Sequence, residues 1–527
     1  MVIHQFIRPD RYGYGFLQGS AIVVVLLFLA CAPVEKQQER FHDSLVDGAA
    51  YEVVKVDARE TIRHFTEHPV GINLNYLMDD DALLNPETGI VESLKALGVK
   101  YLRYPGGEKS DSYLWTVPPW PNSATEKLKP MLARTGPNEW PANSKFTLAD
   151  METLVPEVLD FDEFMSVCRA IDCEPVLVVP ADSPYVPSRG GGKIPTREQL
   201  IENATEWVRY ANLTRSYGIK YWMIGNETWN LTITGGTEAK TYARDLVDFS
   251  VAMKTIDPSI KIIANGYAES WWREILQTAS GHIDYLGVSN YPLHAWKGFE
   301  TYQAKEIEFD RAVKVAISAI EKFAPSTDAN RLEVIVSETN VIDWSKRGWE
   351  NRNDLGHALV LFQMIGDVLL EKKVPFFQYW TTRWIDDDSL GFPRVFDAID
   401  QNGRFQATGM TLAIWGNYLF DTMISTVGSK DVKTYGTLNT KTDRLNLFLL
   451  NKNSHSRPIA IAINGHQRVG TVTRKSLSGT GPEDIKPNWR TGTEELVDGE
   501  LKFILPAVSI TILELPAYSA GSVAVPK

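Results

Sequence analysis

Two glutamates end short apolar segments of the chain, and their type and position allow one specific chemistry. Gly225-Asn226-Glu227 closes the segment KYWMIGNE, and Glu338 closes LEVIVSE, 111 residues further on. Hydrolysis of a glycosidic bond needs such a pair, one carboxylic acid to protonate the leaving oxygen and one carboxylate to act at the anomeric carbon. Carboxyl groups about 5 Å apart give retention of configuration, and a gap of about 6.5–9.5 Å gives inversion. The alternative is that each glutamate is an ordinary strand-end residue held in a salt bridge.

Both segments belong to a repeating pattern between residues 68 and 420. Short runs rich in Val, Ile and Tyr alternate with longer stretches whose apolar residues recur every three or four positions, as in helices. Eight buried strands alternating with helices favour an α/β fold, the (β/α)8 TIM barrel, over an open sheet, which would carry G-x-G-x-x-G after its first strand. Functional residues of such a barrel lie at the C-terminal ends of the strands, which here include Glu227 and Glu338. The predicted strands are residues 69–76, 100–107, 174–181, 220–227, 261–266, 283–290, 332–338 and 375–380. The predicted helices include residues 161–171, 197–218, 241–256, 309–323 and 355–373.

The pattern changes at about residue 421 to strands alone. Short β-rich runs separated by turn residues such as Asn464-Gly465 predict a C-terminal antiparallel β-sandwich domain over residues 421–527. These runs are residues 433–440, 444–452, 457–465 and 501–515. One further run, YEVVKVDA, lies within residues 51–67, before the barrel, and is expected to pair with this domain.

The first 50 residues have the composition of an export signal and a tether. Arg8 and Arg11 precede the apolar run AIVVVLLFLA, which is far shorter than the roughly 20 residues of a membrane span. The run ends at Cys31 in a sequence that resembles a bacterial lipobox, so residues 1–31 are read as a lipoprotein signal and residues 32–50 as a flexible tether. The expected location is the bacterial cell envelope, as an outer-membrane lipoprotein held by a lipid on Cys31. Simple secretion and a buried apolar helix are the alternatives.

Composition narrows the possible partners. The 527-residue chain has a formal charge of −12, which argues against a nucleic-acid partner, since such proteins normally carry a basic face. Its nine histidines form no H-E-x-x-H motif and no close His/Cys cluster, so we predict no metal and no cofactor. The expected partner is a carbohydrate substrate, and the oligomeric state stays open.

The motifs together resemble a known group of enzymes. GNE at the fourth strand with a glutamate at the seventh is similar to the retaining glycoside hydrolases of clan A. Within the clan, the chain most resembles family 51, the α-L-arabinofuranosidases, over nearly all of residues 51–517. The segments that carry this resemblance are LRYPGG (102–107), LDFDEFMSVCRAIDCEPVLVV (159–179), WMIGNE (222–227), IDYLGVSNY (283–291) and LPAVSITIL (505–513).

The resemblance implies roles for individual residues. Glu227 would be the general acid/base and Glu338 the nucleophile. Asn226 would bind the sugar 2-hydroxyl, and Tyr291 would hydrogen-bond the nucleophile. Arg103 would lie near Glu338, where a cation favours the carboxylate form.

Two further positions carry weaker expectations, and two of the roles just given have alternatives. Trp380, at the end of the eighth strand, would give an apolar face for a sugar ring, although Trp380 and Tyr291 are alternatively core aromatics. Arg103 alternatively pairs with another acidic neighbour inside the barrel. His294, in NYPLHAW, is a candidate sugar ligand or an ordinary loop histidine.

Three positions depart from the family pattern. Glu108 stands where the family has Asn, Ser289 where it has His, and Pro180 where it has Asn. These departures keep open another clan A glycosidase, of the agarase, xylanase or glucuronidase type, and a catalytically silent surface glycan-binding protein. The long loop from residue 108 to 159 adds three tryptophans, which either stack on sugar rings or close the loop onto the barrel: Trp115, Trp120 and Trp140.

Overall fold

The computed structural model gives a defined placement to most of the chain, within one compact unit. The described residues are 50–111, 113–132, 158–182, 195–230, 237–292, 296, 298–304, 307–342, 351–383, 393–429, 431–464, 470–496 and 500–517.

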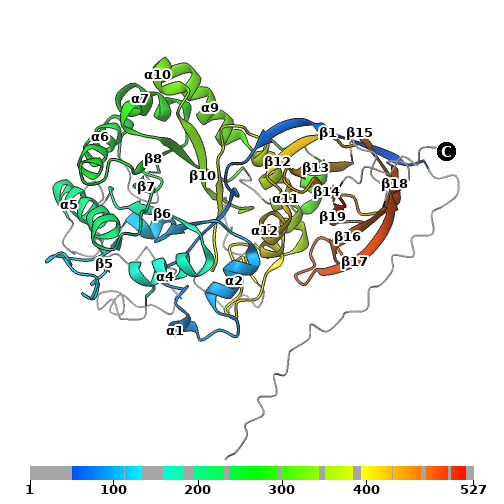
Figure 1. Ribbon diagram of the computed structural model, residues 1–527, viewed down its shortest axis with the longest axis horizontal. Helices are drawn as coiled ribbons and strands as arrows, with labels where there is room; N and C mark the ends of the chain where they lie inside the picture. The colour runs from blue at the N-terminus through cyan, green and yellow to red at the C-terminus, as the bar shows by residue number, and fades with distance from the viewer. Residues whose placement is uncertain are drawn as a thin grey trace, which may run out of the picture. The chain divides into compact units, whose positions relative to one another are not determined.

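Eight of the described strands close a parallel barrel (Figure 1). Seven of the eight predicted strand segments contain one of them, and β10 extends one residue beyond its predicted segment, to Thr339. Strands buried on both faces are near-continuous apolar runs, which makes them recognisable in the sequence. Around the barrel they follow the order β10-β11-β2-β3-β6-β7-β8-β9. Their bounds are β2 Val70–Asn73, β3 Tyr101–Tyr104, β6 Glu174–Val179, β7 Tyr221–Ile224, β8 Lys261–Gly266, β9 Tyr285–Asn290, β10 Glu333–Thr339 and β11 Phe377–Tyr379.

Helices such as α5, α6, α7 and α9 cover the outside of the barrel (Figure 1). Two of the long helices begin at a capping box. Asp160 and Glu163 form a reciprocal capping box at α4, and Thr196 and Gln199 form one at α5. The predicted helix over 197–218 is α5 followed by a π-helical segment, Arg209–Thr214. The bounds of the longer helices are α2 Ile90–Leu97, α4 Phe161–Ile171, α5 Arg197–Val208, α6 Ala239–Ile256, α7 Glu269–Ala279, α9 Arg311–Phe323, α11 Leu355–Leu369 and α12 Ala407–Tyr418.

Short elements occupy the connections between these strands and helices. They are the helices α1 Asp81–Leu84, α8 Phe299–Ala304 and α10 Ser326–Ala329, the 3-10 turns Gly107–Asp111 and Ser280–His282, and the strand pair β4 Tyr113–Leu114 and β5 Met131–Leu132.

Alternation along the strands divides the barrel core into two layers. In β3, Tyr101 points into the barrel, where its ring stacks on Phe376 with centroids 3.9 Å apart, and Leu102 packs outward under the helices. Arg103 therefore returns to the inside, next to Met223 of β7. The interior is closed by packed side chains below the level of Arg103.

Nine described strands form the C-terminal sheet, and the predicted fold class of barrel plus sandwich-like domain is confirmed. The sheet differs from the prediction in one pairing, because β1 runs parallel to β15 and antiparallel to β12. The strand order is β17-β16-β19-β14-β13-β12-β1-β15-β18. The bounds are β1 Glu52–His64, β12 Thr422–Val427, β13 Val432–Asn439, β14 Arg444–Asn451, β15 Arg457–Asn464, β16 Gly470–Ser478, β17 Asn488–Leu496, β18 Glu500–Leu505 and β19 Ser509–Leu515.

The sheet packs on barrel helix α11 through specific contacts. The Tyr435 hydroxyl of β13 donates to Asp367 Oδ1 at 2.9 Å, and its ring lies against Gly366, where a Cβ would be 2.3 Å from the ring. A side chain at position 366 would therefore push the two parts of the chain apart.

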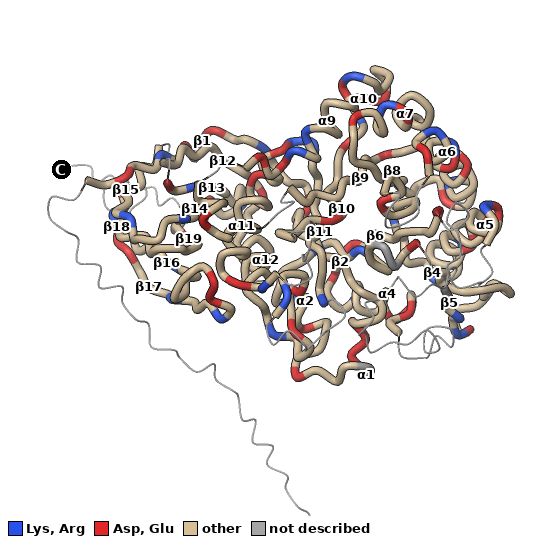
Figure 2. The backbone as a smooth tube through the Cα atoms, turned by 180° about the vertical axis from the view of Figure 1, so that it is seen from behind, with Lys and Arg blue, Asp and Glu red and all other residues tan. Residues whose placement is uncertain are grey.

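Charges are mixed over the described surface. Lys and Arg residues are scattered among Asp and Glu residues on the barrel and on the sheet (Figure 2). In the part of the chain that the structure describes, none of the helices combines the length and apolar character needed to cross a bilayer.

Candidate active site

Glu338 is held in the barrel by two hydrogen bonds. Its Oε1 accepts from Arg103 Nη1 at 2.8 Å, and its Oε2 accepts from the Tyr291 hydroxyl at 2.8 Å. Strict alternation with the inward-facing Ile335 would turn Glu338 toward the helices. The register of β10 against β9 shifts between Val336 and Glu338, and this irregularity lets the carboxylate face the interior. The side chain is fixed and only 5% exposed.

Glu227 lies on a tight turn directly after β7. Gly225 and Glu227 both have positive φ, 69° and 45°. A Cβ at Gly225 would be 2.5 Å from Thr228 Oγ1, so only glycine fits that position. The backbone N–H of Thr228 donates to Asn265 Oδ1 of β8 at 2.8 Å, which anchors the turn. Glu227 is half-buried and so more accessible than Glu338.

Arg103 connects the two glutamate segments. Besides Glu338, it donates from Nη2 to Asn226 Oδ1 at 2.6 Å and from Nη1 to Asn73 Oδ1 at 2.7 Å. The guanidinium is fully buried and forms an ion pair with the Glu338 carboxylate at 2.8 Å. One planar side chain thus sets the position of Glu338 relative to the Asn226-Glu227 turn.

Tyr291 follows β9 and faces both carboxyl groups. Burial raises the pKa of its phenol well above the ordinary value, and the negative charges of Glu338 and then Glu227 raise it further. The phenol therefore stays protonated and donates to Glu338. Because both glutamates act on one hydroxyl, the structure brings Glu227, Glu338, Asn226, Arg103 and Tyr291 to one end of the barrel.

Two polar residues of this end were missed by the sequence analysis. Asn73 ends β2, and its Nδ2 donates to the carbonyl oxygens of Ser337 at 2.9 Å and Tyr379 at 3.1 Å. Asp111 accepts from the backbone N–H of Asn226 at 3.2 Å. Asn73 could have been found from the sequence, because it lies at the end of the first barrel strand. Asp111 lies in the connection after β3, and no sequence feature marked it as a site residue.

Trp380 packs at the end of β11 and is mostly buried. A Cβ at Gly107 would lie 2.0 Å from its ring, so the ring rests on the backbone of the RYPGG segment. With 5% exposure, Trp380 is a core aromatic in this conformation, and it offers little of its face to a sugar.

Two of the loop tryptophans, Trp115 and Trp120, belong to the described residues and pack on the barrel. Trp115 is fully buried, stacks on Tyr210 with centroids 5.0 Å apart, and donates from its indole N–H to the Asn203 carbonyl at 3.1 Å. Trp120 stacks on Trp115 at 6.1 Å. The interpretation of Trp115 as a sugar-stacking residue is therefore wrong, because no face of its ring is accessible.

Several sequence predictions fall outside the described residues, namely those on His294, Trp140 and Cys31. Among the residues that the structure does describe, no group of three or more His, Cys, Asp or Glu side chains is arranged to hold a metal ion.

The sequence is similar to those of known α-L-arabinofuranosidases. A family model described as an alpha-L-arabinofuranosidase 1 domain matches residues 93–312, which include Arg103, Glu227 and Tyr291. The chain is 28% identical over 331 residues to a probable alpha-L-arabinofuranosidase C of Aspergillus clavatus, covering 56% of this chain and 60% of that protein. It is 25% identical over 311 residues to the intracellular exo-alpha-(1->5)-L-arabinofuranosidase 1 of Bacillus subtilis, covering 55% and 57%. The chain spans 37% to 60% of the length of the curated relatives it matches.

Solved structures share the fold at low identity. An alpha-L-arabinofuranosidase from Thermotoga maritima, in complex with arabinose, aligns with a TM-score of 0.67 at 18% identity, over 88% of this chain and 99% of that chain. A family 44 xyloglucanase of Paenibacillus polymyxa aligns with a TM-score of 0.59 at 14% identity, over 89% and 100%. The family model and the relatives confirm the resemblance to the family 51-like α-L-arabinofuranosidases of clan A.

The relatives also correct the predicted location. The curated relatives that match include fungal α-L-arabinofuranosidases and a Bacillus protein named as intracellular. A bacterial outer-membrane lipoprotein is not supported, and that prediction is wrong. The predicted location rested on a short apolar run near the N-terminus. Such a run identifies a hydrophobic segment but does not determine where in the cell a protein is located.

Proposed function

We propose that the protein is a retaining glycoside hydrolase, an α-L-arabinofuranosidase that acts on plant polysaccharides or their oligosaccharides. The observation that carries the proposal is the environment of Glu338, which is held between Arg103 and Tyr291 at 2.8 Å from each, at the same barrel end as Glu227. The family model and the curated relatives support the sugar assignment.

In the first step the ionised carboxylate of Glu338 attacks the anomeric carbon. Arg103 and Tyr291 each bind one of its oxygens, so the carboxylate needs little reorientation before the attack. The product of the step is a covalent glycosyl-enzyme.

Glu227 is the general acid of the first step and the general base of the second. It protonates the leaving oxygen and later takes a proton from the water that hydrolyses the glycosyl-enzyme. Its half-buried position suits this exchange, since the leaving group and the water must both reach it.

Asn226 is positioned to bind the sugar. Its Oδ1 accepts from Arg103 at 2.6 Å, which leaves Nδ2 to donate to a sugar hydroxyl. A contact to the 2-hydroxyl strengthens as the transition state forms and so lowers the barrier.

The decisive experiment removes the nucleophile. Glu338→Ala is expected to reduce the hydrolysis of an aryl α-L-arabinofuranoside by several orders of magnitude, and azide is expected to restore part of the turnover as a glycosyl azide of inverted configuration. Glu321→Ala, at an exposed glutamate of α9, is the matched control and is expected to keep full activity. Unchanged hydrolysis by Glu338→Ala would contradict the proposal.

A second candidate keeps the same two glutamates and changes the sugar. Glu108, Pro180 and Ser289 depart from the family pattern on the substrate side and favour another clan A glycosidase of the agarase, xylanase or glucuronidase type. A panel of aryl glycosides, xylan and agar separates the two candidates. Binding of these polymers without any turnover would instead indicate a glycan-binding protein.

A further inference from the structure

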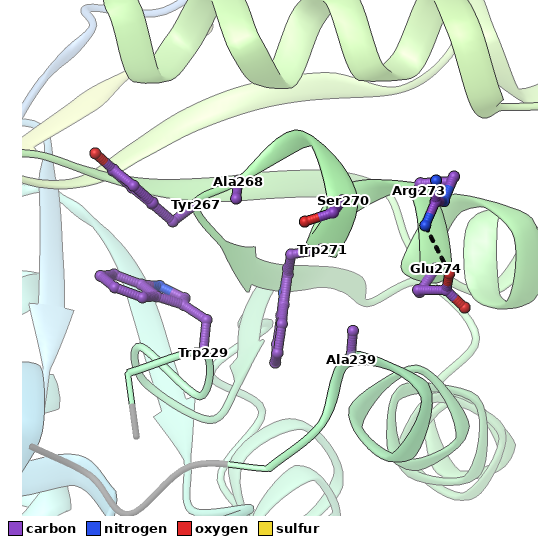
Figure 3. A pocket seen from close by; sticks show the side chains of 8 residues that line it. All are labelled: Trp229, Ala239, Tyr267, Ala268, Ser270, Trp271, Arg273 and Glu274. Atoms are coloured by element: carbon purple, nitrogen blue, oxygen red, sulfur yellow. Dashed lines mark hydrogen bonds and ion pairs between the residues drawn. The ribbon is translucent and has the colours of Figure 1, made fainter. Parts of the chain in front are cut away.

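A cavity of about 370 Å³ opens beside the C-terminal ends of β7 and β8 (Figure 3). Three aromatic side chains line it, Trp229, Tyr267 and Trp271, and the facing pair Arg273 and Glu274 lies at one side. Its size lies at the lower end of small-molecule pockets, which span about 300–1,000 Å³. The catalytic steps described above use none of these residues.

Two of the aromatic rings form a partly exposed stacked pair. Trp229 and Tyr267 stack with centroids 5.0 Å apart and an angle of 24° between their planes. Tyr267 is 44% exposed, among the most exposed large apolar side chains of the described chain. The pair therefore presents apolar ring surface to the cavity, against which another flat apolar surface can pack.

The third ring is fixed. The Trp271 indole N–H donates to the Asn265 carbonyl at 2.9 Å, and the ring stacks on Tyr242 with centroids 5.6 Å apart. Because these contacts already hold the Trp271 ring in place, a ligand that packs against it would bind without the entropic cost of ordering the Trp271 side chain.

The pocket is linked to the acid/base through Asn265. Trp229 lies two residues after Glu227, and Thr228 between them is bonded to Asn265 Oδ1 at 2.8 Å. The same asparagine holds Trp271 through its carbonyl. The pocket wall and the Glu227 turn therefore form one unit.

A second cavity, of about 410 Å³, extends the path toward the nucleophile. It shares Tyr267 and Ala268 with the first and reaches Asn290 and Tyr291. Tyr267 thus stands between the aromatic pocket and the residue that hydrogen-bonds Glu338.

We propose that the aromatic pocket binds a neutral sugar ring on the leaving-group side of a polymeric substrate. The inference rests on the proposed function, because the leaving group departs past Glu227, on whose turn the pocket is built. The apolar face of a sugar ring packs on aromatic rings, and its hydroxyls meet the polar rim. Arg273 and Glu274 pair at 3.4 Å and cancel each other's charge, which favours an uncharged sugar.

A kinetic comparison tests the pocket. Trp229→Ala and Tyr267→Ala are measured on arabinoxylan and on 4-nitrophenyl α-L-arabinofuranoside, with Trp489→Ala as the control at a 41% exposed tryptophan of the sheet. In the two pocket variants, the ratio of kcat/KM on the polymer to that on the aryl glycoside is expected to fall about tenfold, and in the control it stays unchanged. An unchanged ratio in both pocket variants overturns the proposal.

A binding measurement separates failure of the pocket from failure of the proposed function. Xylotetraose, α-1,5-arabinotriose and cellotetraose are titrated into the unmodified protein and into Tyr267→Ala, whose exposed position does not threaten folding. At least one oligosaccharide is expected to bind, with its Kd raised about tenfold in Tyr267→Ala. Such a loss supports the pocket even if no glycoside is hydrolysed. Binding of none of the three, or a Kd that Tyr267→Ala leaves unchanged, overturns it.

Discussion

Arg103 donates from Nη1 to Glu338 Oε1 at 2.8 Å across the barrel interior. Both side chains are buried, so the desolvation of two charges is offset only by their mutual attraction and by the remaining hydrogen bonds of the guanidinium. Such an arrangement contributes little net stability and fixes geometry instead. The fixed quantity is the direction of the Glu338 carboxylate relative to Asn226, which shares the same guanidinium.

Arg103→Lys is expected to lower kcat/KM on an aryl arabinofuranoside on the order of a hundredfold. Lysine keeps the positive charge but lacks the planar guanidinium that donates to Glu338, Asn73 and Asn226. The loss of kcat/KM therefore measures how much the orientation of the Glu338 carboxylate contributes to turnover. Steady-state kinetics should place most of the loss in kcat, because the interaction matters after the sugar is bound. Arg404→Lys, at an exposed arginine paired with Glu87, is the control and should retain activity. A Lys variant with unchanged kcat would show that Arg103 has no positioning role.

The hydroxyl of Tyr291 is expected to matter for turnover more than for folding. Tyr291→Phe removes one of the two donors to Glu338 and is expected to reduce kcat about 10- to 100-fold. Tyr302→Phe removes a comparable buried hydroxyl, which donates to Gln363 at 2.7 Å away from the site. Both variants are expected to lose about 1 kcal/mol of stability, and only the first should lose turnover. Equal kcat in the two variants would contradict a role for Tyr291 in catalysis.

The barrel could be predicted because its strands are short continuous apolar runs, which alternate with clear helical periods. In the C-terminal sheet, the short strand β12 escaped prediction, and so did β16 and β17. Their sequences, GTVTRKSLS and NWRTGTEEL, are mostly polar, and their pairing is determined by neighbouring strands and not by an apolar period. The parallel pairing of β1 with β15 could not be predicted either, since it joins strands about 400 residues apart.

The site could be predicted only where a strand end or a motif marked the residue. Glu227 and Glu338 close apolar runs, and Asn73 also ends a strand, whereas Asp111 is recognised only by its contact with the backbone of Asn226. The irregularity in β10 that turns Glu338 inward has no signature in the sequence.

Trp115 is expected to contribute to the stability of the fold and not to substrate binding. Its indole is fully buried against Trp207 and Tyr210, so Trp115→Ala should lower the free energy of unfolding by about 3–5 kcal/mol. Trp120→Ala, at the partly buried neighbour, should lower it by less. Urea denaturation measures both. A variant of Trp115 with normal stability and a raised KM would instead restore the interpretation as a sugar contact.

His68 makes the stability of the fold depend on pH. Both ring nitrogens are buried without a hydrogen-bond partner, and burial, with a smaller effect of the Lys100 charge, lowers the pKa of His68 to about 4. Between that value and the ordinary value of 6.5, the unfolded chain binds a proton that the folded chain does not. Stability from this residue is therefore complete above pH 6.5 and is lost as the pH falls toward 4, by up to about 3 kcal/mol.

His68→Leu removes this titration while keeping an apolar side chain at the position. Urea denaturation between pH 7.5 and 4.5 is expected to show a smaller loss of unfolding free energy in the variant than in the unmodified protein, because the other titrating groups are common to both. The same replacement at the exposed His455 is the matched control and should leave the pH dependence unchanged. Parallel curves for the unmodified protein and His68→Leu would show that the burial of His68 does not control acid stability.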